Sequence, residues 1–529
     1  MKTYFTPLFG IIFLSLILLG CGDSDNSLGE KPFEQQTISA KEKIKQALST
    51  EYLEKLGFSA EDQAYLKDVY AGRDHQPFWM NDSTLTEVGE KLKKVFDTPE
   101  QLGVPAGRHA YPKTNNFVQD EIASTLVFAK VVNDLENGVL NYETKEKNPV
   151  AAVPADQLGS LAKFDGSGDL RPQFLKYSVS DSNYAVLGKG LIELMDNYPM
   201  DEKTFEVRSI KFDSTESINL ATEALISKGY LGVDNDTAAM FVALREFQIQ
   251  NGLKPDGVIG KYTSIALNES TAHRRDRIIL AMDKMRSKEP YPQKYIRINI
   301  PEYKLRFFIN DSLKSDHNIV VGTNDKQTPE LTSKLNRIIA YPYWNVPYSI
   351  SSEEILPAAK ANPNYFERHR YTLYKDGDTI DPLTVDWKSI RQTSFPFKVV
   401  QDVGRSNSLG IIKFNFPNSH SVYFHDTPSK SLFSTDVRAY SHGCMRTQNP
   451  VDLATRILER DVVGRRANTV VIPDSLDSIM SRGKNYTIKL LEPIPVFIEY
   501  VSVARVGEQM VTHIDIYGRD EEYLKILTE

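Results

Sequence analysis

A cysteine and three histidines lie close together in the last quarter of the sequence. His420 and His425 precede the segment Tyr440-Ser441-His442-Gly443-Cys444. A thiol with an ordinary pKa of about 8.5 is only slightly ionised at neutral pH, and a neighbouring imidazole can take its proton and later protonate a leaving amine. A glycine beside the thiol permits a tight turn whose backbone N–H groups can form an oxyanion hole. This pattern predicts acyl transfer by Cys444.

Two other interpretations fit the same residues. A single Cys in a strand-rich domain is often a small buried hydrophobic side chain. Nitrogen and sulfur donors in sets of four also form zinc sites, which makes His420, His425, His442 and Cys444 a possible ligand set. Because His420 and His425 are five positions apart, they would point to opposite faces of one extended strand, which disfavours the four-ligand site.

Strands must position these residues, and the sequence predicts them in several places. Residues 295–300 and 305–309 alternate between apolar and polar types around a short turn, which is typical of a hairpin. Further strand signals cover 397–400 and 411–416. Between them, residues 349–391 carry a helix-forming patch and many polar residues, and this length suits a lid better than a connector.

The first part of the chain has helical periodicity. Apolar residues recur at spacings of three and four from about residue 44 to 198, and Trp79 is expected to be a core anchor within this scaffold. Helices are also predicted at 220–228, 237–251 and 263–267, around two Gly-containing turns. The sequence from Ala243 to Thr263, with its Asp256-Gly257 turn, resembles the small three-helix peptidoglycan-binding domain, which implies binding to cell-wall glycan or peptide.

Composition narrows the class of protein. The 529 residues are 41% hydrophobic and 25% charged, which is typical of a globular protein with several domains. The formal net charge is −7, so no basic excess favours nucleic acid as a partner. There are two cysteines, Cys21 and Cys444, which excludes a fold held together by several disulfides. The expected fold class is multidomain α+β.

The N-terminus has the features of an export signal. Lys2 is followed by the apolar run 11–19, which is well short of the ~20 residues of a membrane-spanning helix. The sequence Leu18-Leu19-Gly20-Cys21 resembles a bacterial lipobox, which implies lipidation at Cys21. Residues 22–40 are polar and are expected to form a flexible tether. We therefore expect a membrane-anchored lipoprotein in the cell envelope, on the periplasmic side.

The region around Cys444 resembles a known enzyme family. Ser441-His442-Gly443-Cys444 with His425 upstream is similar to the active-site motif of L,D-transpeptidases with a YkuD-type catalytic domain. The longer run 401–428, with Lys413-Phe414 and Phe416-Pro417-Asn418, and the tail 493–520 resemble the large multidomain branch of that family. That branch also carries a helical scaffold, a peptidoglycan-binding domain and a lid.

The resemblance implies a role for each site residue. Cys444 is the nucleophile and His425 the general base, with the Asp426 carbonyl a better candidate than its carboxylate for orienting the imidazole. His442 lines the site and helps shape the oxyanion hole, to which Gly443 and Cys444 contribute backbone donors. Arg446 either pairs with a substrate carboxylate or forms a structural salt bridge. The expected substrate-binding set is Arg446, Ser441 and Tyr423, and no metal or organic cofactor is expected.

The implied reaction joins two peptidoglycan stems. Cys444 attacks the L-centre carbonyl of a donor stem, D-alanine leaves, and an amine of an acceptor stem resolves the thioester. Carbapenem-type β-lactams are expected to acylate Cys444. The alternatives are an L,D-carboxypeptidase using the same site, a catalytically idle wall-binding lipoprotein, and a zinc hydrolase.

We predict seven segments along the chain. They are a signal peptide at 1–20, a tether at 21–40, a helical scaffold at 41–205, a peptidoglycan-binding domain at 206–270, a connecting helix at 271–290, a catalytic domain at 291–485 with its lid at about 349–391, and a C-terminal extension at 486–529.

Overall fold

The computed structural model describes most of the chain after the tether. The described residues are 38–81, 84–109, 114, 116–149, 166–211, 214–461 and 473–528. The predicted signal peptide, the lipidation site at Cys21 and nearly all of the tether lie outside them. Within these ranges no helix combines the length and apolar character needed to cross a bilayer.

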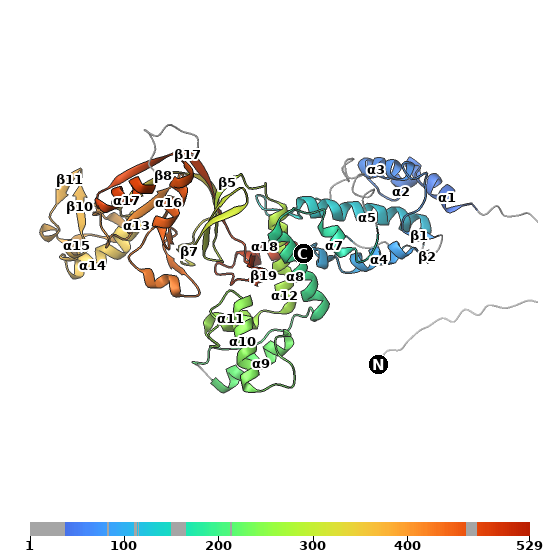
Figure 1. The fold of residues 1–529 in the computed structure, drawn as a ribbon, viewed down its shortest axis with the longest axis horizontal. Coiled ribbons are helices and arrows are strands. Elements are labelled where there is room, and N and C mark those ends of the chain that lie inside the picture. The colour runs from blue at the N-terminus through green and yellow to red at the C-terminus, as the bar shows by residue number, and fades with distance from the viewer. Residues whose placement is uncertain are drawn as a thin grey trace, which may run out of the picture.

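The N-terminal part is helical, and residues from Ile44 to Phe174 form an apolar core within it, whereas α8 (Ser182–Asn197) packs in a second core with α12 (Thr271–Arg286) and the C-terminal tail (Figure 1). Its helices are α1 (Ala40–Ala47), α2 (Thr50–Lys55), α3 (Ala60–Ala71), α4 (Glu87–Asp97), η1 (Pro99–Leu102), α5 (Phe117–Asn137), α7 (Arg171–Leu175) and α8 (Ser182–Asn197). Two small hairpins join them: β1 (Met80–Asn81) with β2 (Thr84–Leu85), and β3 (Leu140–Asn141) with β4 (Glu146–Lys147). Trp79 is buried in this core and its indole N–H donates to Thr125 Oγ1 at 2.9 Å, as expected of an anchor.

Three helices form the next unit: α9 (Ser214–Ser227), α10 (Thr237–Gln250) and α11 (Lys261–Asn268). The buried Gln248 side chain holds the second turn, because its amide oxygen accepts from Gly257 N–H and its amide nitrogen donates to the Val258 carbonyl. Gly257 has φ +73°, in the left-handed region that glycine adopts without strain. Helix α12 (Thr271–Arg286) then leads to the β-rich part.

The β-rich part is a closed sheet. Its strands are β5 (Lys294–Asn299), β6 (Lys304–Ile309), β7 (Ser312–Gly322), β8 (Leu331–Ala340), β13 (Ile412–Asn415), β14 (Phe424–His425), β15 (Ala439–Ser441), β16 (Met445–Thr447) and β17 (Tyr486–Glu499). The ring runs β7-β16-β14-β13-β8-β17-β5-β6, and β6 pairs back onto β7. Apolar side chains fill its interior, and α16 (Pro450–Asp461), α17 (Pro473–Ser481) and η7 (Lys430–Ser434) flank it.

An insertion with its own core interrupts the barrel between β8 and β13. Its sheet has the order β11-β10-β12-β9, from β9 (Trp344–Asn345), β10 (Tyr371–Lys375), β11 (Asp378–Ile380) and β12 (Lys398–Gln401). Its helical segments are α13 (Tyr348–Ile350), the π-helix η3 (Ser351–Ile355), α14 (Leu356–Ala361), α15 (Tyr365–Arg368), η4 (Pro382–Thr384), η5 (Trp387–Ser389) and η6 (Gln392–Ser394). The core of this insertion runs from Trp344 to Leu409, so the unit is longer than the predicted lid at 349–391.

The predicted boundary at residue 485 also needs correction. Strand β17 pairs with β8 and with β5 inside the barrel, so the sequence after 485 begins with a structural strand and not with an extension. The chain then forms the hairpin β18 (Val503–Val506) and β19 (Gln509–Thr512), followed by α18 (Arg519–Thr528). This tail packs against α8 and α12, which joins the barrel to the helical part.

Candidate active site

The strand pair β14 and β16 positions the candidate catalytic residues. The two strands are parallel, with Phe424 opposite Met445 and His425 opposite Arg446. Phe424 and Met445 are fully buried in the barrel core. Because side chains alternate along a strand, His425 and Arg446 point away from that core. Tyr423 and Cys444 each lie two residues earlier and therefore on the same outward face. The ideal strand spacings place the Cα atoms of His425 and Cys444 roughly 8 Å apart.

Cys444 is a half-buried free thiol on this face. Burial raises its pKa above the ordinary value, and three weaker effects oppose that rise: contacts from the Tyr423 backbone and hydroxyl, and the positive charge of Lys413. The thiol is therefore neutral in the resting site. An external base has to remove its proton before it can act as a nucleophile.

His425 is buried beside the thiol. Its Nδ1 contacts the carbonyl of Asp426, which confirms that this carbonyl orients the ring. A carbonyl can only accept, so Nδ1 carries the proton and Nε2 keeps its lone pair in the neutral ring. Burial, together with the charges of Arg446 and Lys413, lowers the pKa of His425 to about 3, although backbone contacts to Asp426 and Leu409 oppose the shift. His425 is thus a neutral imidazole with a free basic nitrogen, which is the form that a general base requires.

The Asp426 carboxylate has a different task from its carbonyl. It accepts from Ile411 N–H at 3.0 Å and pairs with Lys430. These contacts fix the strand that follows Gly410 next to the base. They also account for the burial of an acidic side chain at this place, since a buried carboxylate needs charged or N–H partners.

Ser441 and Gly443 shape the nucleophile loop rather than contact a ligand. The Ser441 hydroxyl donates to the Cys444 carbonyl at 2.6 Å and accepts from Gly443 N–H at 3.3 Å. The predicted substrate-binding role of Ser441 is therefore corrected to loop closure, since its side chain is buried and its hydroxyl is used within the loop. Gly443 has φ +101°, a conformation that other residues adopt only with strain.

The two predicted oxyanion donors, the N–H groups of Gly443 and Cys444, differ in whether they already have a hydrogen-bond partner. Gly443 N–H points to Ser441. Across the described residues, Cys444 N–H donates no hydrogen bond. The Cys444 amide is thus the stronger candidate for stabilising an oxyanion.

His442 turns from the nucleophile loop toward the insertion. Its Nε2 lies 2.5 Å from Glu354 Oε1, and the neighbouring Glu353 pairs with Lys326 at 2.8 Å. Both acids belong to the π-helix η3, a rare element that often occurs at functional sites. His442 therefore links the nucleophile loop to the insertion, in addition to lining the site as predicted.

Arg446 and Lys413 supply positive charge to the outward face. Burial lowers the pKa of Arg446, and no carboxylate of the described residues forms an ion pair with it, so a structural salt bridge finds no support. Lys413 lies opposite His425 on β13, and its Nζ is 3.6 Å from the centre of the Tyr423 ring. No role for Lys413 was predicted from the sequence. Because Lys413 is adjacent to the apolar Phe414 on a predicted strand, the alternation of side chains could have indicated that Lys413 faces outward.

The zinc interpretation is not supported by the placement of its donors. His420 is exposed on a turn, whereas His425 lies on β14 and Cys444 directly precedes β16. Throughout the described ranges, no three His, Cys, Asp or Glu side chains are arranged to hold a metal ion.

A polar network from the C-terminal tail supports the nucleophile loop. Buried Thr328 accepts from Gly322 N–H and donates to the Gly443 carbonyl, both at 2.9 Å. Thr328 N–H in turn donates to the Tyr517 hydroxyl at 3.2 Å, and that hydroxyl donates to the Gly322 carbonyl at 2.7 Å. Sequence reasoning missed both side chains, because they lie far from Cys444 along the chain.

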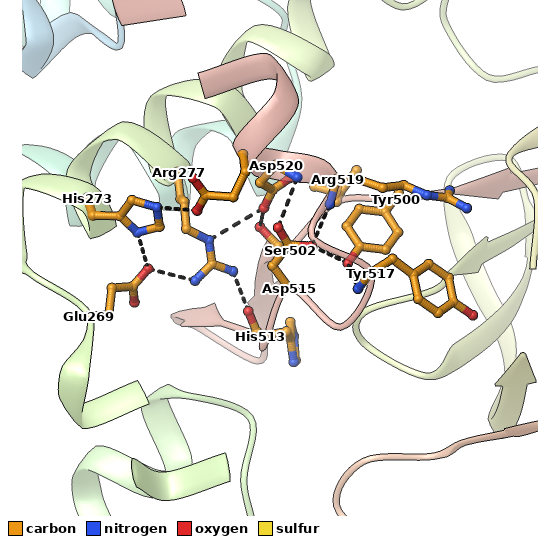
Figure 2. A network of polar contacts seen from close by, with 12 residues as sticks. Glu269, His273, Arg277, Tyr500, Ser502, His513, Asp515, Tyr517, Arg519 and Asp520 are labelled. Atoms are coloured by element: carbon orange, nitrogen blue, oxygen red, sulfur yellow. Dashed lines mark hydrogen bonds and ion pairs between the residues drawn. The ribbon is translucent and has the colours of Figure 1, made fainter. Parts of the chain in front are cut away.

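Figure 2 shows how this network continues into α12. Tyr517 N–H donates to the Tyr500 hydroxyl at 3.0 Å, and Tyr500 pairs with Asp515, which also accepts from Asp520 N–H. Arg277 on α12 contacts Asp520 at 3.4 Å and Glu269 at 2.8 Å. The loop that carries Cys444 is thus connected by hydrogen bonds to the end of the three-helix unit.

Comparison with known proteins identifies the β-rich part. The L,D-transpeptidase catalytic domain of the YkuD family matches residues 293–472, which include Cys444, His425 and the insertion. A separate family, described as a scaffold domain, matches residues 64–191.

The chain is also similar to individual proteins that are named as L,D-transpeptidases. A Haemophilus influenzae protein named "Putative L,D-transpeptidase" is 38% identical over 229 residues, which are 43% of this chain and 45% of that protein. The chain thus aligns with less than half of that relative's length. An Enterococcus faecium L,D-transpeptidase mutant is 10% identical (39% and 50% of the two chains, TM-score 0.17), and one from Xylanimonas cellulosilytica is 13% identical (57% and 100%, TM-score 0.16). These two TM-scores are too low to support any argument about this chain.

Replacing Lys413 is expected to make Cys444 less reactive. The Lys413 charge favours the thiolate, so Lys413→Met removes a factor that lowers the thiol pKa and moves that pKa further up. The alkylation rate of Cys444 by iodoacetamide, measured against pH, will rise at higher pH than in the wild type. Lys489→Met removes an exposed lysine of the same barrel and will leave the profile unchanged. An identical profile for Lys413→Met would contradict the electrostatic role.

Replacing Thr328 is expected to disturb the nucleophile loop. Thr328→Val keeps the shape but leaves Gly322 N–H and the Gly443 carbonyl without their partner, which costs about 1–3 kcal/mol of stability. A displaced loop should also lower kcat for a peptide donor about ten- to a hundredfold, with little change in KM. Thr328→Ser keeps the hydroxyl and should restore kcat. Wild-type kcat in Thr328→Val would contradict the role of the hydroxyl.

Proposed function

We propose that the protein is an L,D-transpeptidase that crosslinks peptidoglycan stems by cysteine acyl transfer. The observation that carries this proposal is the pairing of β14 with β16, which places the Cys444 thiol and the free nitrogen of His425 on one face of an L,D-transpeptidase domain. The charges of Arg446 and Lys413 on that face suit a substrate with free carboxylates, as stem peptides have.

The proposed reaction has two acyl-transfer steps. His425 Nε2 takes the thiol proton as Cys444 Sγ attacks the L-centre carbonyl of the third donor residue, and Cys444 N–H stabilises the oxyanion. The peptide bond breaks, and the imidazolium returns the proton to the leaving amine of D-alanine. The side-chain amine of an acceptor stem then attacks the thioester and gives a proton to His425. The carbon–sulfur bond breaks, and the imidazolium returns this proton to the leaving thiolate, which restores the free thiol and the neutral imidazole.

The insertion bears on which acceptor resolves the thioester. It contacts the site at two points, through Glu354 on His442 and through Trp344 on Tyr423. A covered thioester is protected from water, which would otherwise give the carboxypeptidase product. An L,D-carboxypeptidase is therefore the second candidate function, and it differs only in the species that attacks the thioester.

Replacing the nucleophile tests the proposal directly. Cys444→Ala should lower crosslink formation from a tetrapeptide donor at least about a thousandfold, with the thermal unfolding temperature nearly unchanged. Chromatography of muropeptides made by the purified protein measures crosslinked and hydrolysed products separately. Wild-type protein should also gain the mass of a carbapenem on Cys444. Crosslinking that persists in Cys444→Ala would contradict Cys444 as the nucleophile. A wild type with neither turnover nor adduct would favour the idle wall-binding alternative.

We further propose that Cys21 carries a lipid that anchors the protein on the periplasmic side of an envelope membrane. The support is the sequence Leu18-Leu19-Gly20-Cys21 alone, since these residues lie outside the described structure. Cells fed a labelled fatty acid should label the wild-type protein but not Cys21→Ser. The Cys444→Ser protein serves as the matched control and should keep its label. A Cys21→Ser protein that is still labelled would contradict lipidation at this residue.

A further inference from the structure

A cavity of about 740 Å³ lies apart from the active site. Its walls come from α8, the three-helix unit, the start of α12 and the β18–β19 hairpin, which meet near the middle of the molecule (Figure 1). The cavity is large enough for a short peptide segment. None of its lining residues belongs to the strands that carry Cys444 and His425.

Two buried cations line this cavity. Lys228 and Arg274 are 7% and 8% exposed. Lys228 Nζ donates to the main-chain carbonyl of Glu269 at 2.5 Å, and Arg274 Nη1 donates to the Tyr230 hydroxyl at 3.3 Å, while Arg274 Nε has no partner. Among the described residues, neither cation forms an ion pair with a carboxylate. A buried charge without a counter-charge destabilises a protein, so it is expected where a ligand supplies that charge.

The carboxylates around the cavity have other partners. Glu269 is held by Arg277 at 2.8 Å and by His273 at 2.9 Å, as Figure 2 shows. Glu193 pairs with Lys189 and Glu508 with Arg505, while Glu246 accepts from Gln250 at 2.9 Å. None of these acids forms an ion pair with either of the two buried cations. Burial lowers the pKa of Lys228 to about 8, and the more distant charges of Glu269 and Asp201 offset only part of that effect.

We propose that Arg274 and Lys228 bind a free carboxylate of a peptidoglycan stem peptide in this cavity. The choice of ligand rests on the proposed function. An Arg fork matches the planar carboxylate, and the Tyr230 hydroxyl and Gln250 amide next to it suit a peptide backbone. The apolar and acidic remainder of the wall, including Met510 and Glu193, disfavours a multiply charged phosphate.

A stem held here would act as a second, non-catalytic attachment. It would keep the protein on the polymer while Cys444 reacts with another stem, which raises the effective concentration of donor and acceptor. Binding at this cavity needs no chemistry at Cys444. The two sites can therefore be tested separately.

Retention on purified sacculi tests the site. Full-length protein carrying Cys444→Ser is sedimented with sacculi, and its apparent Kd is compared with that of the same protein carrying Arg274→Gln. Loss of a charge-assisted carboxylate contact should weaken binding about tenfold or more. The matched control is Lys211→Gln, which removes an exposed charge from the same part of the chain and should not change the Kd.

A second variant keeps the test decisive if Arg274→Gln does not fold. Gln250→Glu is nearly isosteric and places a carboxylate next to the Tyr230 hydroxyl that Arg274 contacts. This internal negative charge should compete with the stem and weaken binding as Arg274→Gln does. Unchanged Kd values in the folded variants would overturn the proposal.

Modified sacculi identify the ligand. The protein with the wild-type cavity residues should bind poorly to sacculi whose stem carboxylates have been converted to amides. It should also bind poorly to glycan from which the stems have been removed. Undiminished binding to either material would overturn a carboxylate site. The outcome is independent of the proposed function: Arg274-dependent binding without any turnover would leave this site intact, and turnover with Arg274-independent binding would remove only this site.

Discussion

The active site depends on the parallel pairing of β14 and β16. The burial of Phe424 and Met445 fixes which face of this pair points inward, and the alternation of side chains then forces Cys444 and His425 outward together. A shift of one residue in either strand would place a core side chain outside and a catalytic one inside. The apolar core of the barrel and the chemistry of its surface are therefore set by the same register.

The pair needs support, because β16 begins directly after a turn in which Gly443 has a positive φ. Ser441 closes that turn from within, and Thr328 holds the Gly443 carbonyl from the neighbouring strand end. Tyr517 then ties Thr328 to the C-terminal tail. The tail also packs on α8 and α12, so one segment stabilises both the nucleophile loop and the junction with the helical part.

Burial decides the protonation states that this arrangement presents. Desolvation keeps the Cys444 thiol protonated and the His425 ring neutral, so the resting site is an uncharged acid and base. Lys413 and Arg446 provide positive charge near these two side chains. Among the described residues, no carboxylate forms an ion pair with Arg446. Such a site gains its thiolate during the reaction, when a substrate brings its own charge and excludes water. The proposed site at Arg274 is similar in this respect, because its buried cations would be neutralised by the carboxylate of a bound ligand.

The α+β class and most of the helices and strands could be predicted from the sequence, because spacing, alternation and turn residues act locally. The same local patterns indicated Cys444 and His425 as candidate catalytic residues. The sequence also indicated the Asp426 carbonyl, since that group is adjacent to His425 in the chain. The sequence could not show that β17 completes the barrel, that Ser441 is used inside its loop, or that Thr328, Tyr517 and Lys413 surround the nucleophile. Only the tertiary structure decided these, because closing a barrel joins residues that are far apart along the chain, and no local pattern records that closure.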